Sequence, residues 1–140
     1  MRRALESRWT FVTQGDTEVL LAGLVLEGES FLGRLEGMWA FALWDALTQQ
    51  VLLGRDRLGK KPLFFQQLQG PGLVCASELP ALRKLSVEAW SEDEDSTADY
   101  LRYGYNLPGY TAYREVRELL PGHTSRWNAQ GGQLTTQHFS

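Results

Sequence analysis

The segment Met38–Trp44 places the tightest constraint on how this chain can fold. All of its residues are apolar, so both faces of a strand would be apolar: Met38, Ala40, Ala42 and Trp44 on one, and Trp39, Phe41 and Leu43 on the other. A strand with one face in solvent alternates apolar and polar residues, whereas a strand covered on both faces has no such requirement. The segment is also short for a helix. It therefore predicts a central strand between two covering layers.

Length and composition restrict the class of protein. The 140 residues suit one domain, and an apolar fraction of 43% with a charged fraction of 22% is typical of globular proteins. The net charge of -3 gives no reason to expect a nucleic acid or an anionic membrane as partner. The single cysteine, Cys75, excludes an internal disulfide framework and a cysteine-rich zinc site.

The hydropathy of the chain bears on its location. No apolar run approaches the roughly 20 residues that a membrane-spanning helix needs. The N-terminal residues MRRALESRW are charged and no apolar signal region follows them, so we do not expect a secretory signal. The expected location is the cytoplasm.

The best helical pattern of the chain follows Asp16. Within Thr17–Gly28, apolar residues at the i, i+3 and i+4 spacing predict one face packed in the core: Leu20, Leu21, Leu24 and Val25. Asp16 is placed to cap the helix, Glu18 adds favourable charge in the first turn, and Gly28 is expected to end it.

Turn residues between short apolar runs predict three antiparallel hairpins. The expected pairs are Met38–Trp44 with Gln50–Gly54, Pro62–Gln67 with Leu73–Ala76, and His123–Trp127 with Gln133–Phe139. Hairpins with helices between them are typical of an α+β protein with mostly antiparallel sheets.

The remaining segments are expected to be short. Helical structure is predicted near Met1–Arg8, at Phe31–Glu36, after a capping Ser77, and at Thr97–Tyr105, with a short strand at Trp9–Thr13. The acidic run Glu92–Asp95 is expected to be a solvated connection between helices.

Five segments occur in an order that resembles one known family. They are GDTEVLL (Gly15–Leu21), GMWAFALWD (Gly37–Asp45), GRDRLGKKPLFF (Gly54–Phe65), CASELPAL (Cys75–Leu82) and LLPGH (Leu119–His123). Together they cover roughly Leu5 to Phe139 and resemble the glutaminase domain of glutamine-hydrolysing asparagine synthetases, which are class II amidotransferases. The resemblance implies a partial N-terminal-nucleophile αββα sandwich, with two stacked, mainly antiparallel sheets flanked by helices.

The resemblance also implies a reaction. In such domains an N-terminal cysteine thiolate attacks the side-chain amide of glutamine, its own α-amine acts as the base, and an oxyanion hole stabilises the tetrahedral intermediates. Ammonia leaves and serves a separate ATP-dependent synthetase domain, which amidates an acceptor such as aspartate. ATP and Mg²⁺ would belong to that synthetase domain, so no cofactor and no metal are expected in this chain.

The printed sequence departs from the family at its beginning. It starts Met1-Arg2-Arg3 where the family starts Met-Cys-Gly, and it contains neither the Asn-Gly-Glu-Ile-Tyr-Asn segment nor the upstream arginine that contacts substrate. We therefore expect residues 1–140 to be a single, incomplete amidotransferase domain that is inactive alone. The alternative is a non-catalytic binding or regulatory module whose sheets are completed by a partner chain, either a separately encoded N-terminal segment or a synthetase subunit. A decaying gene product that does not fold stably is a third possibility.

Site residues follow from the matching motifs. The resemblance implies that Asp16, after Gly15, contacts the α-amino group of glutamine, although a plain helix cap would explain the same residue. It also implies that Arg55 and Asp56 form a structural pair, and that Gly59 and Pro62 form turns beside the active-site region.

Three other features are candidate sites with simpler explanations. The basic loop Arg55–Lys61 could hold a phosphate, but it lacks the glycine and lysine spacing of a P-loop. Cys75 lies in an apolar strand, where a buried inert thiol is expected. His123 and His138 lack partners at metal-ligand spacing, so structural roles are expected.

Overall fold

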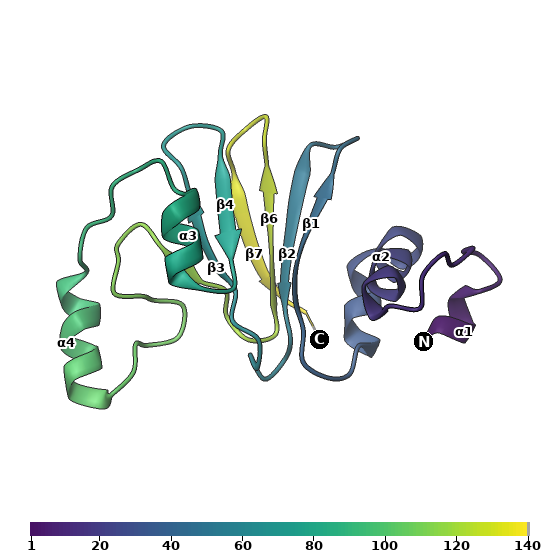
Figure 1. The fold of residues 1–140 in the computed structure, drawn as a ribbon, viewed down its shortest axis with the longest axis horizontal. Coiled ribbons are helices and arrows are strands. Elements are labelled where there is room, and N and C mark those ends of the chain that lie inside the picture. The colour runs from purple at the N-terminus through teal and green to yellow at the C-terminus, as the bar shows by residue number, and fades with distance from the viewer. Residues whose placement is uncertain (140) are drawn as a thin grey trace. The chain divides into compact units, whose positions relative to one another are not determined.

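The computed structural model describes residues 1–139, which divide into two units (Figure 1). The first unit comprises Met1–Glu36 with Phe139, and the second comprises Gly37–His138. The first contains the helices α1 (Arg2–Leu5) and α2 (Asp16–Glu27) and the 3₁₀ helix η1 (Gly28–Arg34).

The first unit is packed around the ring of Phe31 in η1. Phe31 forms a buried cluster with Leu5 of α1 and Ala22 of α2. A Cβ atom at Gly23 would lie 2.2 Å from the Phe31 ring, so the ring occupies the space that a side chain would need. The small residues of α2 therefore form the buried side, because they allow η1 to approach closely.

This packing corrects the predicted core face of α2. Leu24 is buried as expected, but Leu21 is 37% exposed and Val25 is 60% exposed. The helix is apolar nearly all round, so the spacing of large residues did not identify the packed side. Gly28 ends the helix as predicted, with φ of 66° and its N–H donating to the Leu24 carbonyl. The strand predicted at Trp9–Thr13 is wrong, because this segment has no regular secondary structure.

The second unit contains two antiparallel sheets. The four-stranded sheet has the order β1-β2-β6-β7 and the three-stranded sheet the order β4-β3-β5. All three predicted hairpins are confirmed. The strands are β1 (Ala40–Asp45), β2 (Gln50–Arg55), β3 (Phe64–Gln67), β4 (Leu73–Ala76), β5 (Arg117–Glu118), β6 (His123–Asn128) and β7 (Leu134–His138).

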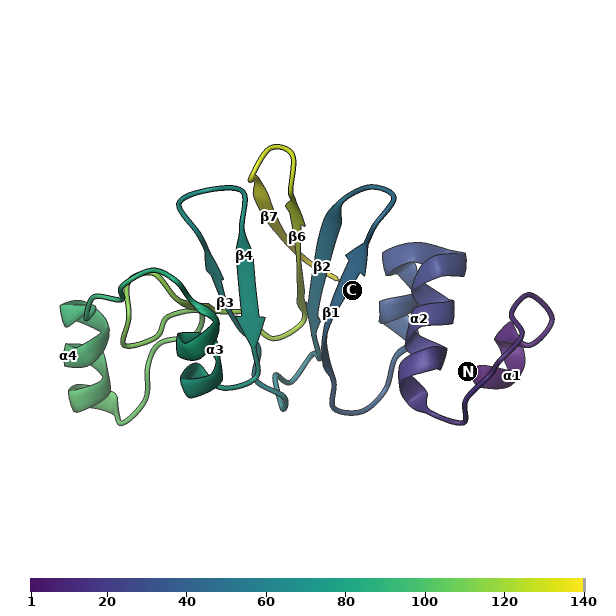
Figure 2. The same ribbon diagram turned by 45° about the horizontal axis from the view of Figure 1, so that its top comes forward.

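The two sheets pack against each other through a shared apolar core. Leu53 of β2 meets Phe65 of β3, together with Leu63 and Leu119. Figure 2 shows the sheets side by side, with helix α3 (Leu79–Leu85) against the second sheet, where it contacts β3 and β4. The predicted arrangement of stacked antiparallel sheets flanked by helices is confirmed.

The position of β1 differs from the prediction. Among the described strands β1 pairs with β2 alone and forms the edge of its sheet, with Met38 64% exposed and Trp44 50% exposed. The strand buried as expected for a central position is β2, where Leu52 and Leu53 are 6% and 0% exposed. An apolar run shows that a strand belongs near the core, but it does not reveal how many strands pair with it.

Two helix starts in the second unit also differ from expectation. Ser77 does not cap α3, whose N-cap position is Glu78. Helix α4 (Glu94–Tyr103) begins within the acidic run, because the Asp93 carboxylate accepts a hydrogen bond from the Ser96 N–H at 3.1 Å. Glu92, Glu94 and Asp95 are exposed to solvent as expected. Glu94 and Asp95, however, lie in the first turn of α4, where negative charge is favourable, and not in a connection between helices.

None of the helices formed by residues 1–139 has both the length and the apolar character needed to cross a membrane.

Candidate functional site

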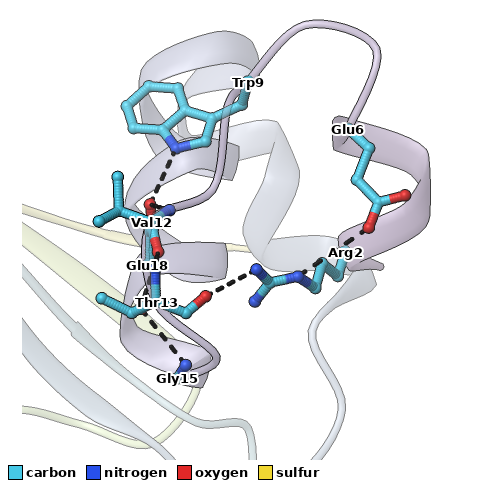
Figure 3. Close-up of polar contacts among 7 residues, drawn as sticks. All are labelled: Arg2, Glu6, Trp9, Val12, Thr13, Gly15 and Glu18. Atoms are coloured by element: carbon cyan, nitrogen blue, oxygen red, sulfur yellow. Dashed lines mark hydrogen bonds and ion pairs between the residues drawn. The ribbon is translucent and has the colours of Figure 1, made fainter.

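The loop before α2 is held by the side chain of Glu18 (Figure 3). Its carboxylate accepts hydrogen bonds from the backbone N–H of Val12 at 2.9 Å and of Thr13 at 2.6 Å. It also accepts from the Thr13 hydroxyl at 2.7 Å and from the indole N–H of Trp9 at 3.4 Å. The bonds from Val12 and Thr13 lower the pKa of Glu18 from 4.5 to about 2. Glu18 therefore fixes the path of the chain that leads into Asp16.

Arg2 of α1 holds the same loop from another direction. Its Nη2 donates to the Thr13 carbonyl oxygen at 2.6 Å, and its Nε lies 4.0 Å from a carboxylate oxygen of Glu6 (Figure 3). The Arg2 guanidinium also lies over the Phe11 ring, 4.2 Å from the ring centroid. The loop is thus fixed by side chains of both α1 and α2.

Replacing Glu18 with glutamine is expected to loosen the loop. A neutral amide offers one acceptor oxygen where a carboxylate offers two, so the variant cannot accept all of these hydrogen bonds. We expect the Val12 and Thr13 amide hydrogens to exchange with solvent roughly tenfold faster, as measured by NMR. In the wild type the folded pKa of Glu18 lies below its ordinary value, so protection is full above pH 4.5 and is lost as the pH falls toward 2.

The matched control for this variant is Glu6→Gln. Glu6 takes part in an exposed ion pair with Arg2, and exposed pairs contribute little to stability. Amide exchange at Val12 and Thr13 should be unchanged in this control. Equal exchange rates in Glu18→Gln and the wild type would show that Glu18 does not hold the loop.

Asp16 is the first residue of α2, and its side chain is exposed. The prediction that Asp16 caps the helix is wrong, because Gly15 occupies the N-cap position and its N–H donates to the Thr13 hydroxyl oxygen at 3.3 Å. The Asp16 carboxylate has no hydrogen-bond or ion-pair partner among residues 1–139. An unpaired carboxylate held at the start of a rigid helix is suited to bind an ammonium group. The contact with the α-amino group of glutamine stays a prediction.

In the second unit, Asp56 organises the basic loop after β2. Its buried carboxylate accepts from the backbone N–H groups of Trp39 at 3.2 Å, Leu58 at 3.1 Å, Lys60 at 3.1 Å and Lys61 at 3.2 Å. Burial alone would raise the pKa of Asp56, but the four hydrogen bonds outweigh it and the pKa is lowered. A phosphate cradle needs free backbone N–H groups, and here three loop amides already donate to Asp56. The N–H groups of Leu58, Lys60 and Lys61 are therefore satisfied within the loop and are not available to bind a phosphate.

Arg55 holds the same loop from inside the unit. It is 7% exposed, and its guanidinium donates to the carbonyl oxygens of Lys61 at 2.8 Å, Leu119 at 2.5 Å and Gly59 at 2.9 Å. Its Nη2 also lies 2.8 Å from a carboxylate oxygen of Glu118. The positive charge of Arg55 is therefore neutralised and hydrogen-bonded within the protein.

Gly59 lies within this loop and Pro62 directly follows it. Gly59 has φ of 61°, and a Cβ atom there would lie 2.7 Å from Cγ of Pro121, so both its conformation and its surroundings require glycine. Pro62 lies between the loop and β3. Asp16 and Gly15 belong to the first unit, whereas the loop residues belong to the second.

The contacts and burial of Cys75 and of the two histidines are those of residues with structural roles. Cys75 lies in β4, partly buried, and burial raises the pKa of its thiol. The His123 and His138 rings face each other edge-on with centroids 5.1 Å apart, and Nδ1 of His123 lies 2.8 Å from the Pro121 carbonyl oxygen. No group of three or more metal-ligating side chains occurs within the described residues 1–139.

Sequence reasoning missed the role of Glu18 as the anchor of the loop. The residue was expected only to add charge to the first turn of the helix. A signal was present, because an acidic residue three positions after an N-cap commonly returns to the backbone before the helix. Here Glu18 stands three positions after Gly15 and bonds farther back, at Val12 and Thr13.

The family model for the glutamine amidotransferase domain matches residues 1–139. Asparagine synthetase B [glutamine-hydrolyzing] of Escherichia coli is 42% identical over 133 residues, which cover 86% of this chain and 24% of the relative. The amidase chyE of Penicillium rubens is 32% identical over 122 residues, which cover 87% of this chain and 17% of the relative.

A solved structure has a similar fold. Glutamine phosphoribosylpyrophosphate amidotransferase from B. subtilis superposes with a TM-score of 0.62 at 24% identity, covering 99% of this chain and 26% of that one. The chain spans about a fifth of the length of the curated relatives that it matches. The family match over residues 1–139 is continuous through both units, and the chain belongs to the glutamine amidotransferase domain family.

Proposed function

We propose that this chain is the glutamine-binding part of an asparagine-synthetase-type amidotransferase, in which Asp16 binds the α-ammonium group of glutamine. The observation that carries the proposal is the exposed, unpaired carboxylate of Asp16 at the start of α2. Glu18 holds the preceding loop, so the position of Asp16 is fixed before any ligand binds. Such preorganisation reduces the entropy lost on binding.

The proposed reaction is the release of ammonia from glutamine for the amidation of an acceptor, such as the conversion of aspartate to asparagine. ATP and Mg²⁺ would act in a separate synthetase domain, and a cytoplasmic location remains part of the proposal. The relatives include both asparagine synthetases and amidases, so the acceptor is not specified by the family.

We further propose that the 140-residue chain does not hydrolyse glutamine by itself. Its single cysteine, Cys75, lies within β4, where it has no adjacent α-amine to act as base. Burial raises the pKa of the thiol and disfavours the reactive thiolate. The chain would then contribute binding of glutamine, and a nucleophile would have to come from elsewhere.

Titration with L-glutamine followed by NMR tests the Asp16 proposal. We expect millimolar binding, equivalent to about -4 kcal/mol, with shifts in the amide signals of residues 15–18. Asp16→Asn keeps the shape of the side chain but removes its charge, and should weaken binding roughly tenfold. Glutaric acid monoamide, which lacks the α-amino group, should not distinguish wild type from variant.

Two results would contradict these proposals. Equal glutamine affinity in the wild type and Asp16→Asn would remove Asp16 from the binding site. Steady release of glutamate by the wild-type chain, abolished in Asp16→Ala, would show that the chain is catalytic alone.

A second candidate function is a non-catalytic module completed by a partner strand. It is favoured by the edge position of β1, whose hydrogen-bonding edge and exposed Trp44 could accept another strand. A well-folded monomer in dilute solution, with no tendency to associate, would count against it.

A further inference from the structure

The two histidines of the chain lie directly opposite each other on neighbouring strands. His123 begins β6 and His138 ends β7, and the register of the two strands pairs them. The Asn128 N–H donates to the Gln133 carbonyl oxygen at 3.1 Å, and because hydrogen-bonded pairs alternate along a hairpin, the two histidines form a non-hydrogen-bonded pair. Side chains of such a pair lie especially close together. The hairpin therefore brings two imidazoles together on one face of the sheet.

The separation of the two rings suits two ligands of one metal ion. The ring centroids of His123 and His138 lie 5.1 Å apart, and the ring planes meet at 78°. A zinc ion held tetrahedrally by two imidazoles, with zinc–nitrogen bonds of about 2.1 Å, places the ring centroids about 5 Å apart. The separation therefore already matches such a site. The edge-on arrangement requires one ring to rotate, and we expect that ring to be His138, which is exposed.

The His123 ring is held in the tautomer that a metal ligand requires. Its Nδ1 lies 2.8 Å from the Pro121 carbonyl oxygen, and Nδ1 carries the ring proton because a carbonyl oxygen can only accept. The lone pair of the neutral ring is then on Nε2, the nitrogen that would bind the metal. Ligating histidines commonly donate their other ring N–H to a backbone carbonyl, which fixes the orientation of the ring. This contact supports a metal site independently of the distance between the rings.

Gly122 leaves space beside the His138 ring. Its φ is 69°, and a Cβ atom there would lie 3.2 Å from Nε2 of His138 and 3.7 Å from Cα of Arg57. The Gly122 N–H donates to the Asp56 carbonyl oxygen at 3.0 Å, so Gly122 connects the histidine pair to the loop after β2. A metal ion bound by both histidines would cross-link the start of β6 to the end of β7 beside this loop.

Two arginines lie in the segments next to the histidine pair and restrict the kind of cation. The charge of Arg55 is neutralised by Glu118, 2.8 Å away. Arg57, whose Cα lies beside Gly122, adds a positive charge to the adjoining loop. Calcium and magnesium bind mainly to oxygen ligands that carry negative charge, whereas zinc, nickel and copper bind imidazole nitrogen. The ligands and the local charge therefore favour a late transition-metal ion.

We propose that His123 and His138 form a structural site for a divalent late transition-metal ion such as Zn²⁺. The two imidazoles supply two ligands, and water or a group from another molecule would complete the four-coordinate shell that zinc prefers. The spacing of the two residues along the chain does not indicate this site, because strand pairing brings them together. The site lies in the second unit, whereas Asp16 lies in the first, so this proposal does not depend on glutamine binding.

Isothermal titration calorimetry of the 140-residue chain without an affinity tag measures zinc binding, with Mg²⁺ as the ion that should not bind. We expect one site for Zn²⁺. His123→Ala and His138→Ala should each weaken binding roughly tenfold or more, because the loss of an outer-shell partner alone commonly costs that much. Long-range ¹H–¹⁵N NMR spectra should show the His123 proton on Nδ1 before zinc is added and a zinc-induced shift at its Nε2.

The matched control moves one histidine without changing the composition of the chain. The double variant His138→Gln, Gln137→His places the imidazole one position earlier on β7, where it faces the other side of the sheet. It should bind zinc as weakly as His138→Ala. Cys75→Ser removes the one thiol of the chain and should leave zinc binding unchanged. Circular dichroism establishes that the variants are folded.

Each outcome either supports or overturns the metal-site proposal. An absence of zinc binding by the wild-type chain overturns it, as does wild-type affinity in either alanine variant or in the double variant. Loss of zinc binding in Cys75→Ser alone would assign the metal to the thiol instead. Glutamine affinity should be the same in the histidine variants and the wild type, so failure of the glutamine-binding proposal is detected separately.

Discussion

Replacing Asp56 with alanine is expected to lower the free energy of unfolding by about 4 kcal/mol, since it removes a buried charge and leaves its partners unsatisfied. Four backbone N–H groups, those of Trp39, Leu58, Lys60 and Lys61, would lose their acceptor. This loss is a large fraction of the total free energy of unfolding of a domain, which is typically about 5–15 kcal/mol. Urea denaturation followed by circular dichroism measures it.

Asp45 provides a matched control for Asp56. Its carboxylate also accepts backbone hydrogen bonds, from Leu47 at 2.9 Å and Thr48 at 3.3 Å, but Asp45 is exposed at the end of β1. Water can replace the lost acceptor there, so Asp45→Ala should cost about 1 kcal/mol or less. Similar losses for the two variants would show that the burial of Asp56 is not what makes it important.

The lowered pKa of Asp56 also makes the stability of the wild type depend on pH. The folded pKa lies below the ordinary value of 3.8, so the contribution of Asp56 is present above that pH and is lost as the pH falls below it. Stability of the wild type should therefore fall more steeply than that of Asp56→Asn below about pH 4.

Replacing Gly23 with alanine is expected to destabilise the first unit by about 2 kcal/mol, the cost of overpacking a filled core. Helix propensity alone predicts the opposite effect, a gain in stability of about 1 kcal/mol, because alanine favours a helix more than glycine does. The contact decides the outcome, because the new Cβ would lie 2.2 Å from the Phe31 ring and the ring is fully buried. Thermal unfolding of the wild type and of Gly23→Ala measures the effect.

Two further variants make the Gly23 result specific. Phe31→Leu in the Gly23→Ala background should recover part of the loss, since a smaller side chain leaves room for the methyl group. Gly131→Ala should change stability little, because nothing lies within 4 Å of a Cβ atom there. A gain in stability for Gly23→Ala would mean that η1 can shift away from α2 at little cost.

The features that could be predicted from the sequence are those that depend on residues close together along the chain. Turn residues are local signals, so the three hairpins and the end of α2 at Gly28 were predicted correctly. The core face of α2 could not be predicted in the same way. Which side of an apolar helix is buried depends on the element that packs there, and Phe31 selects the side with Gly23.

The same holds at the candidate site, where a local motif could be recognised in the sequence but contacts between separate segments could not be predicted. Asp16 was named as a candidate from its motif, and its contact with glutamine stays a prediction. The contacts of Glu18 could not be predicted without the path of the loop through Val12 and Thr13. The edge position of β1 depends on how many strands pair with it, and the hydrophobicity of its residues does not indicate that number.

The contacts of Arg55 have a consequence for the order of folding. Its guanidinium reaches the Leu119 carbonyl across 64 positions of sequence, while its other partners include Gly59 and Lys61 close by. The distant contact requires closure of a long chain segment, which is entropically costly and slows folding. Burial of this charge therefore belongs to a late step, so the network around Arg55 would govern the rate at which the second unit unfolds more than the rate at which it forms.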